Sequence, residues 1–185
     1  MIRTLDVIFS LIGLVLGAPI LVLLVLIGLI DSGSPIFRQE RVGKHKQPFT
    51  LVKFRTMRKG TASVATHLAS SSSITFFGRF LRRTKLDELP QLWNVLTGDM
   101  SLVGPRPGLY NQEQLTLCRD AMDVYSVRPG ITGLAQVKEI DMSTPQLLAK
   151  TDAEMIENMN VKNYFRYLIL TISGRGSGDR ISRKP

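Results

Sequence analysis

The chain opens with a long apolar segment, and shorter hydrophobic and polar patterns follow it. Between Val7 and Ile30 there is no charged residue, and Ser10 carries the only side-chain hydroxyl. A helix of this length, at ~1.5 Å per residue, can cross a hydrocarbon core of ~30 Å. The segment is too long for a signal peptide and has no small-residue cleavage site after it. We therefore predict membrane contact for residues 1–31.

The apolar segment contains a proline near its middle, Pro19, which removes a backbone hydrogen bond and favours a bend. The small residues Gly17 and Ala18 before it make that bend sterically easy. The basic residues that follow the segment are Arg38, Arg41, Lys44 and Lys46. They mark its C-terminal side as cytoplasmic. Two arrangements remain open: a kinked single span, or a re-entrant helix broken near Ala18-Pro19 with both ends in the cytoplasm.

The patterns downstream predict a compact α+β domain that is mainly helical. Residues 36–54 form a predicted β-hairpin, because β-branched and aromatic residues flank the turn sequence GKHKQP. Apolar spacing and start signals predict helices at 76–83, after Asp87, at 110–123, at 143–159 and at 161–172. The other segments are expected to be a mobile loop at 60–75, an irregular stretch at 97–108, and a turn with a short strand at 128–137.

The last predicted helix, 161–172, mixes basic and aromatic residues with aliphatic ones. Its polar side carries Lys162 and Arg166, as an interfacial amphipathic helix would. A helix that turns its apolar face to the core has the same pattern. Both interpretations remain open on the pattern alone.

Charge and cysteine content narrow the classes of function. The chain has 24 Lys and Arg against 15 Asp and Glu, a net charge of +9, which suggests an anionic partner: nucleic acid, an anionic membrane surface or a phosphate-bearing substrate. Cys118 is alone, so no internal disulfide can form. His45 and His67 are distant in sequence, and no Cys/His cluster has the spacing of a structural zinc site.

Adjacent carboxylates, Asp87 and Glu88, follow a strongly basic stretch. They could begin a helix, with Asp87 as the N-cap, Glu88 in the first turn and Pro90 tolerated there. The same geometry favours ionised carboxylates. Such a group can bind Mg²⁺ or attack an electrophilic phosphorus. Spacing alone does not separate the cap from the catalyst.

Arginines beside prolines form the second set of candidates. Pro105 and Pro107 stiffen the backbone on both sides of Arg106, whose planar guanidinium suits a phosphate. A rigid loop with a solvated arginine is the alternative, but two prolines around one arginine are uncommon, which favours a functional role for Arg106. Arg128 stands before Pro129 in a similar arrangement, at a natural type II turn.

A further pair of cations lies in LVKFRTM, where Lys53 and Arg55 are two residues apart and share a face if the segment is extended. Ordinary surface charge explains this pair about as well as phosphate binding.

Three stretches together resemble one family: KFRTM (53–57), LDELPQLWNVLTGDMSLVGPRP (86–107) and RPGITGLAQV (128–137). With the proline-containing apolar segment before them, the chain resembles the monotopic phosphoglycosyl transferases of the bacterial sugar transferase superfamily. The resemblance implies a membrane enzyme that moves a sugar-1-phosphate from a nucleoside diphosphate sugar, usually a UDP-sugar, to undecaprenyl phosphate. This is the first membrane step in making glycoconjugates such as exopolysaccharide or O-antigen.

The resemblance also implies roles for residues. Asp87 would attack the β-phosphorus and form a covalent phosphosugar intermediate, with Glu88 assisting at the metal or with protons. Mg²⁺ would be the cofactor and Asp87 its ligand. The expected substrate-binding residues are Arg82, Pro105, Arg106, Pro107, Arg128, Lys53 and Arg55.

For the organisation of the chain, the resemblance favours the re-entrant arrangement. It implies a re-entrant membrane helix at 1–31, a catalytic domain at 32–173 on the cytoplasmic face of the bacterial inner membrane, and a C-terminal tail at 174–185. Family members commonly carry Ser before the proline. Here Ala18 cannot return a hydroxyl to the carbonyls that Pro19 frees.

Two other functions are compatible with parts of the sequence. A Mg²⁺-dependent hydrolase of lipid-linked diphosphates could use the same acids. A membrane-tethered nucleic-acid binder would fit the net charge, but it should interleave basic residues with exposed aromatics. The arginines here cluster around prolines and acids instead. The expected partners are therefore a nucleoside diphosphate sugar, undecaprenyl phosphate and membrane lipids, and not nucleic acid.

Overall fold

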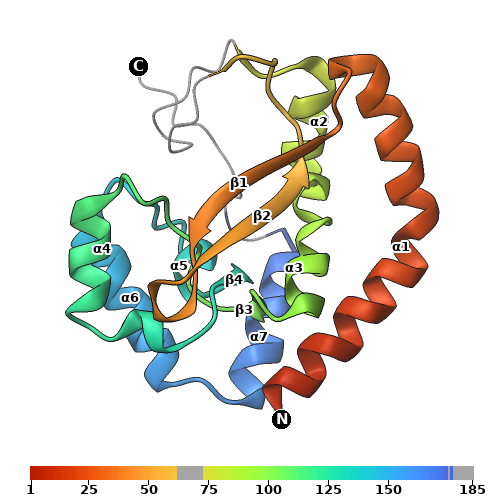
Figure 1. Cartoon of the computed structure of the whole chain (residues 1–185). Coiled ribbons are helices and arrows are strands. Elements are labelled where there is room, and N and C mark those ends of the chain that lie inside the picture. Colours follow the sequence, from red (N-terminus) through yellow and green to blue (C-terminus); the bar gives the residue numbers. More distant parts are fainter. Residues whose placement is uncertain (62–72, 175, 177–185) are drawn as a thin grey trace.

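The structure, a computed structural model, describes residues 1–61, 73–174 and 176. Its helices are α1 (Ile2–Ser32), α2 (Phe76–Thr84), α3 (Gln91–Thr97), α4 (Glu113–Asp120), α5 (Leu134–Val137), α6 (Pro145–Glu157) and α7 (Val161–Ile172). Its strands are β1 (Ile36–Val42), β2 (Pro48–Phe54), β3 (Ser101–Val103) and β4 (Gly130–Thr132). The predicted α+β class is confirmed (Figure 1). Most of the loop expected at 60–75 and of the tail expected at 174–185 lies outside the described residues.

The predicted hairpin is formed by β1 and β2, which pair antiparallel from Ile36 opposite Phe54 to Val42 opposite Pro48. A short 3₁₀ turn, Lys44–Lys46, joins the strands. Because side chains alternate along a strand, every second residue of each strand lies on the same face of the hairpin. This period of two places Arg41 of β1 and Lys53 of β2 on the same face of the hairpin.

A second, parallel strand pair lies where an irregular stretch was expected. β3 pairs with β4, with Ser101 opposite Gly130 and Val103 opposite Thr132. The prediction for 97–108 was therefore wrong for β3, whose three residues are all buried. Behind this pair the backbones of Gly104 and Gly130 touch. A Cβ on Gly130 would lie 2.0 Å from the Gly104 nitrogen, so no larger residue fits there.

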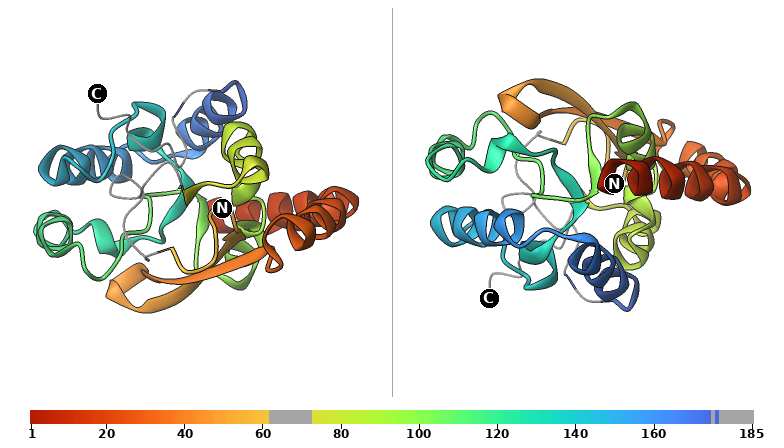
Figure 2. Two further views of the ribbon diagram at one scale, coloured as in Figure 1. Left: turned by 90° about the horizontal axis from the view of Figure 1, so that it is seen from above. Right: turned by 90° about the horizontal axis from the view of Figure 1, so that it is seen from below.

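The helices predicted after the hairpin form, with shorter bounds at α4 and α6. The short strand expected within 128–137 is β4, but the same stretch also contains the helix α5, which was not predicted. Thr75 caps α2 by accepting a hydrogen bond from the Gly78 nitrogen at 2.9 Å. α7 turns Tyr164 and Tyr167 into the core, which confirms the core-facing interpretation for that side. In the views of Figures 1 and 2, α4 and α6 lie on the side of the molecule away from α1.

α1 is the one helix among the described residues that is long and apolar enough to cross a membrane. It is assigned as a continuous helix through Ala18 and Pro19, so the expected break is not an interruption of helical structure. One proline removes a single backbone hydrogen bond, which a helix can accommodate by bending. Figure 1 shows that α1 bends between its ends.

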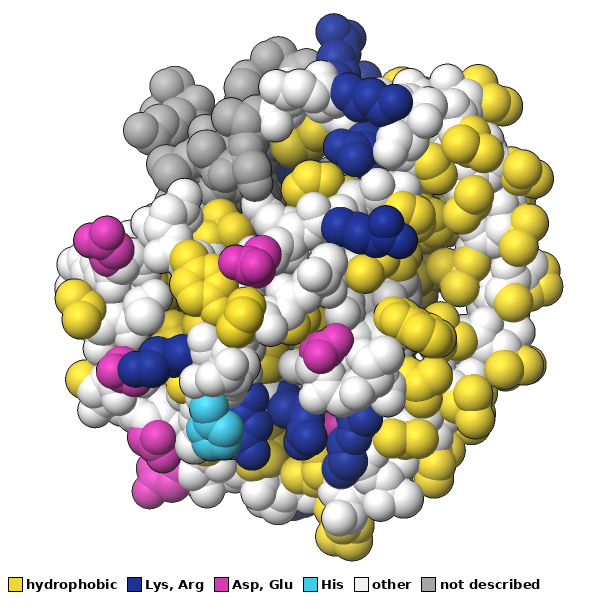
Figure 3. Space-filling view, in the orientation of Figure 1, with side chains coloured by type: hydrophobic (Ala, Val, Ile, Leu, Met, Phe, Trp, Pro, Cys, Tyr) yellow, Lys and Arg dark blue, Asp and Glu magenta, His cyan; other side chains and the backbone are white. Residues whose placement is uncertain are grey.

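Both ends of α1 are attached to the same folded body. Near its start, Asp6 is buried and accepts hydrogen bonds from the Leu102 nitrogen, the Ser101 hydroxyl and the Tyr164 hydroxyl. Farther along, Leu24 packs in a cluster with Phe54 and Leu81. The outward face between these contacts is apolar and exposed, and hydrophobic side chains cover this side of the molecule in Figure 3. An exposed apolar face of this kind is consistent with membrane association.

Candidate active site

The two adjacent carboxylates lie in a 3₁₀ turn, Leu86–Glu88, between α2 and α3. Asp87 is 2% exposed and Glu88 is 8% exposed. The prediction that Asp87 caps the next helix is wrong, because α3 has Pro90 at its N-cap position and no side-chain cap. A capping residue needs extended backbone angles, whereas Asp87 lies inside a helical turn. Asp87 is therefore not the N-cap residue of α3.

The Pro-Arg-Pro segment lies directly against this turn. Nη2 of Arg106 donates a hydrogen bond to Oε1 of Glu88 at 3.1 Å, and the two side chains form an ion pair. Glu88 is nearly buried, while Arg106 keeps about a quarter of its side chain exposed. The structure thus joins the two predicted motifs and leaves part of the guanidinium accessible to a ligand.

A narrow pocket lies beside this ion pair. The residues that line it are Arg41, Leu51, Lys53, Gln91, Arg106, Pro107 and Gly130. Three of them, Arg41, Lys53 and Arg106, are cations from different segments of the chain. The volume of the recess is only about 10 Å³, but the three cations gathered there, next to the Glu88–Arg106 ion pair, favour an anionic group at its mouth.

Arg41 lines this pocket, but it was not among the substrate-binding candidates named from the sequence. It appeared there only among the basic residues that mark the C-terminal side of the apolar segment as cytoplasmic. Phe37 of β1 is the register partner of Lys53 of β2, and register partners lie on the same face of a hairpin. Arg41 is four residues after Phe37, an even number, so it lies on that face too. Nη1 of Arg41 donates to the Pro107 carbonyl oxygen at 3.1 Å. The alternation of side chains along the predicted hairpin, applied to its basic residues, could have identified Arg41 as a neighbour of the site.

Arg82 also lies near the acidic turn, in the last turn of α2. Its Nε donates a hydrogen bond to Oγ1 of Thr56 at 2.9 Å, which ties α2 to the segment that follows β2. The position is compatible with the expected role in substrate binding.

Arg82 does not line this pocket, and neither do two further predicted substrate-binding arginines, Arg55 and Arg128. Nε of Arg55 donates to the Ser34 carbonyl oxygen at 2.8 Å, at the entrance to the hairpin. Nε of Arg128 donates to the Gly98 carbonyl oxygen at 2.7 Å, at the end of α3 that is farther from the acidic turn. In this structure both arginines satisfy backbone carbonyls, which a pattern of charges along the sequence does not show.

The acidic pair can be tested as a metal site from its own geometry. The described residues contain no group of three or more His, Cys, Asp or Glu side chains that could hold a metal ion. Mg²⁺ is commonly held by one or two carboxylates, with substrate phosphates and water completing its shell. Two adjacent, nearly buried carboxylates beside an anion pocket fit that mode of binding, in which the substrate supplies the remaining ligands.

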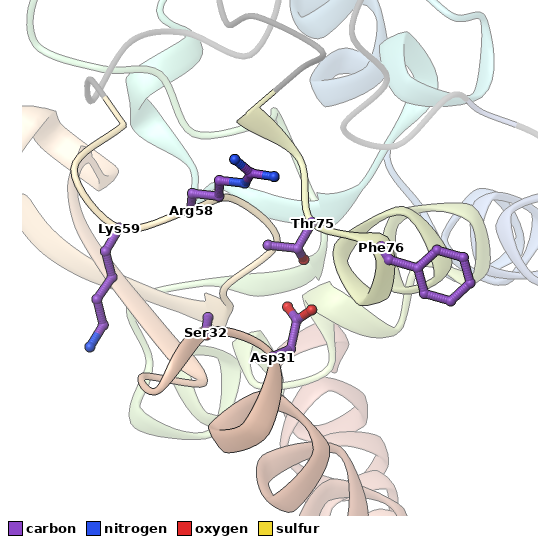
Figure 4. Close-up of a pocket in the computed structure, with 6 residues that line it drawn as sticks. All are labelled: Asp31, Ser32, Arg58, Lys59, Thr75 and Phe76. Carbon is purple, nitrogen blue, oxygen red and sulfur yellow. The ribbon is translucent and has the colours of Figure 1, made fainter.

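A second pocket lies at the C-terminal end of α1 (Figure 4). It is lined by Asp31, Ser32, Arg58, Lys59, Thr75 and Phe76. In Figure 4 the side chains of Arg58, Thr75 and Asp31 face a common space, while the Phe76 ring points away. None of the predicted site residues lines this pocket, so it is separate from the acidic pair.

Comparison with known proteins gives a consistent result over almost the whole chain. The bacterial sugar transferase family matches residues 1–175. The UDP-glucose:undecaprenyl-phosphate glucose-1-phosphate transferase of Caulobacter vibrioides is 38% identical over 177 residues, which cover 92% of this chain and 66% of that protein. The undecaprenyl-phosphate galactose phosphotransferase of Salmonella typhimurium is 37% identical over 162 residues, which cover 77% of this chain and 34% of that protein.

The chain therefore spans from about a third to about two thirds of the length of these relatives. The matched part contains the acidic turn, the Pro-Arg-Pro segment and the apolar N-terminal helix, which are the features that the sequence singled out. By the extent of this match, the chain belongs to the bacterial sugar transferase family.

Proposed function

We propose that this chain transfers a sugar-1-phosphate from a UDP-sugar to undecaprenyl phosphate. The observation that carries the proposal is the ion pair between Glu88 and Arg106, because it joins the acidic turn to a pocket of three cations. A diphosphate at the mouth of that pocket would bring its phosphorus next to Asp87. The relatives' names support the choice of substrates, since they describe transfer of glucose-1-phosphate or galactose phosphate to undecaprenyl phosphate.

The proposed chemistry is a double displacement at phosphorus. A carboxylate oxygen of Asp87 attacks the β-phosphorus of the UDP-sugar, and the bond from that phosphorus to the bridging oxygen breaks. UMP leaves with the electron pair, and the sugar phosphate stays on Asp87 as an acyl phosphate. An oxygen of the lipid phosphate then attacks the same phosphorus and releases Asp87. Arg41, Lys53 and Arg106 stabilise the phosphate charge during both steps.

Asp87, with Glu88 beside it, would hold the Mg²⁺ that the proposal includes. When bound, Mg²⁺ neutralises charge on the diphosphate and polarises its phosphoryl oxygens. The protein's own contribution is to keep both carboxylates nearly buried in a rigid turn, with Glu88 fixed by Arg106 at 3.1 Å. A fixed carboxylate keeps its attacking oxygen close to the position the reaction requires.

We further propose that α1 enters and leaves the membrane on the cytoplasmic face. The support comes from its two attachments: Arg3 donates to the Val95 carbonyl oxygen at 2.6 Å near one end, and Leu24 packs on Phe54 and Leu81 toward the other. A helix with both ends held by one folded domain cannot place those ends on opposite sides of a bilayer. A re-entrant α1 would hold the acidic turn near the surface, where a soluble sugar nucleotide and a lipid phosphate can both arrive.

The proposal is tested by measuring UMP release in nanodiscs that contain undecaprenyl phosphate. A panel of UDP-glucose, UDP-galactose and UDP-N-acetylgalactosamine serves as donors, with Mg²⁺ present. We expect UMP release and a lipid-diphosphate-sugar product with at least one donor, and loss of both in Asp87→Asn. Turnover of a donor by Asp87→Asn at the wild-type rate would overturn the mechanism.

A further inference from the structure

The Pro-Arg-Pro segment is held from outside through its carbonyl groups. Pro105 and Pro107 have no N–H to donate, so the segment cannot use their nitrogens to fix itself. The Pro105 oxygen accepts from the Gly130 nitrogen at 2.8 Å, and the Pro107 oxygen accepts from Arg41 at 3.1 Å. The Gly108 oxygen accepts from the Val42 nitrogen at 3.0 Å. The remaining carbonyl, that of Arg106, is bound by a side chain from another part of the fold.

That side chain is Arg119 of α4, which is 1% exposed. Its Nη1 donates to the Arg106 carbonyl oxygen at 2.8 Å. Its Nε and Nη2 donate to Oδ2 of Asp152 on α6, at 3.0 Å and 2.6 Å. Asp152 is 0% exposed. One buried guanidinium therefore links helix α6 to the backbone of the residue that contacts Glu88.

The ion pair is poorly suited to a purely stabilising role. Burial raises the pKa of the Asp152 carboxyl, although Arg119 acts in the opposite direction. Its Oδ1 is buried and has no hydrogen-bond partner in the described part of the chain. Buried ion pairs can often be replaced by apolar residues with no loss of stability. Two donors of Arg119 bind Asp152, and its Nη1 binds the Arg106 carbonyl oxygen. Packing of α4 against α6 does not require this last hydrogen bond.

We infer that Arg119, oriented by Asp152, is a positioning residue that fixes the backbone of Arg106 so that its guanidinium meets Glu88 and the phosphates. The inference deepens the proposed function and rests on it. The linkage runs from Asp152 to Arg119, from Arg119 to the Arg106 carbonyl, and from the Arg106 side chain to Glu88. Neither Arg119 nor Asp152 lines the pocket, so neither touches substrate in this account.

The test replaces both charges with apolar residues of similar size in the double variant Arg119→Met with Asp152→Leu. Because no charge is left unpaired, we expect its melting temperature to stay within a few degrees of wild type. We expect kcat/KM for the UDP-sugar to fall about 10- to 100-fold, since small displacements of a charge-bearing group are costly in catalysis. If Arg106→Ala lowers kcat/KM through kcat, the double variant should do so through kcat as well, and if it does so through KM, the double variant should also act through KM.

A thermodynamic cycle separates positioning from general damage. Adding Arg106→Ala to the apolar double variant should lower kcat/KM by less than about 3-fold further. The reason is that both changes remove the same interaction, that of the Arg106 side chain with Glu88 and the phosphates. Independent, multiplicative losses would show that Arg119 does not act through Arg106. Glu154→Gln on α6 is the matched control: it removes an exposed charge that pairs with Lys138 at 3.5 Å, away from the pocket, and should leave kcat and KM unchanged.

The remaining outcomes are also decisive. If the double variant fails to fold, Arg119→Lys replaces it: a lysine keeps the charge but cannot bond Asp152 and the carbonyl with a guanidinium's fixed fork, and the same loss is expected. A folded variant, of either kind, with wild-type kcat and KM overturns this inference. If Arg106→Ala also keeps wild-type turnover, the proposed function itself fails at that residue, which distinguishes the two failures.

Discussion

At the level of single residues, the sequence indicated candidate residues for the site more readily than it indicated which groups would contact them. Asp87, Glu88, Lys53 and Arg106 were all found as candidates, and the structure places Arg106 against Glu88 and Lys53 in the adjoining pocket. The hydrogen bond from Arg128 to the Gly98 carbonyl oxygen was not foreseen, because a charge in a sequence does not reveal which carbonyl it will reach. The contacts of such a residue depend on non-local packing.

Arg106→Ala tests the central contact at this scale. Loss of a hydrogen bond to a charged group costs about 1.5–3 kcal/mol, which is about 10- to 150-fold in kcat/KM. Steady-state UMP release with varied UDP-sugar measures it. Arg106→Lys should recover only part of the loss, because lysine is a point donor. Lys138→Ala, an exposed residue outside the pocket, is the control, and an equal loss there would contradict the specific role of Arg106.

At the scale of elements, long patterns were predictable and short, non-local ones were not. The hairpin and helices α2, α6 and α7 agree with the prediction, because their signals lie within the element itself. β3 was missed since it is three residues long and pairs with β4, whose first residue is Gly130. No alternation can appear in a strand of that length when all of it is buried.

The packing of α2 on the segment after β2 gives one prediction for an element. A Cβ on Gly78 would lie 2.1 Å from the Thr56 carbonyl oxygen, so Gly78→Ala must push α2 away. We expect a loss of about 1–3 kcal/mol in the free energy of unfolding, the usual range for overpacking. Gly17→Ala, which meets no atom within 4 Å, is the control and should not be destabilised. Thermal melting in detergent measures both, and equal melting temperatures would contradict the packing.

The attachment of α1 to α7 gives a prediction that depends on pH. Burial, and then the charge of Asp6, raises the pKa of the Tyr164 hydroxyl above its usual value of 10.0. Between the unfolded and folded pKa values the folded chain binds more protons, so stability falls as pH rises above about 10. Tyr164→Phe should be less stable at pH 8, because it loses the bond to Asp6 at 2.9 Å, but its stability should decline less at alkaline pH. Denaturant unfolding at pH 8 and pH 10.5 measures this, and parallel declines would contradict it.

At the scale of the whole molecule, the question is how α1 lies relative to the bilayer. The sequence left a single span and a re-entrant helix both open, since hydropathy and length are the same for each. The feature that supports the proposed re-entrant arrangement is tertiary: residues toward both ends of α1 contact the same folded body. Such contacts depend on residues far apart in the sequence, and for that reason hydropathy could not reveal them.

Cysteine labelling tests this arrangement in membranes. In a Cys118→Ser background, Thr4→Cys places an exposed thiol in the first turn of α1, and Lys59→Cys places one after its C-terminal end. A membrane-impermeant maleimide should label both in inside-out vesicles and neither in intact spheroplasts. Labelling of the two positions from opposite sides would establish a single span and contradict the re-entrant arrangement. Catalytic activity of each variant serves as the control for native folding.

The most direct test of the central claim is the mass of the protein after incubation with a UDP-sugar and Mg²⁺ in the absence of lipid phosphate. We expect release of about one UMP per protein and a mass increase equal to one sugar phosphate, located on Asp87 by peptide mapping. The adduct should disappear on adding undecaprenyl phosphate and should be absent in Asp87→Asn. UMP release and product formation without any adduct on Asp87, under conditions where wild type turns over, would contradict the covalent mechanism.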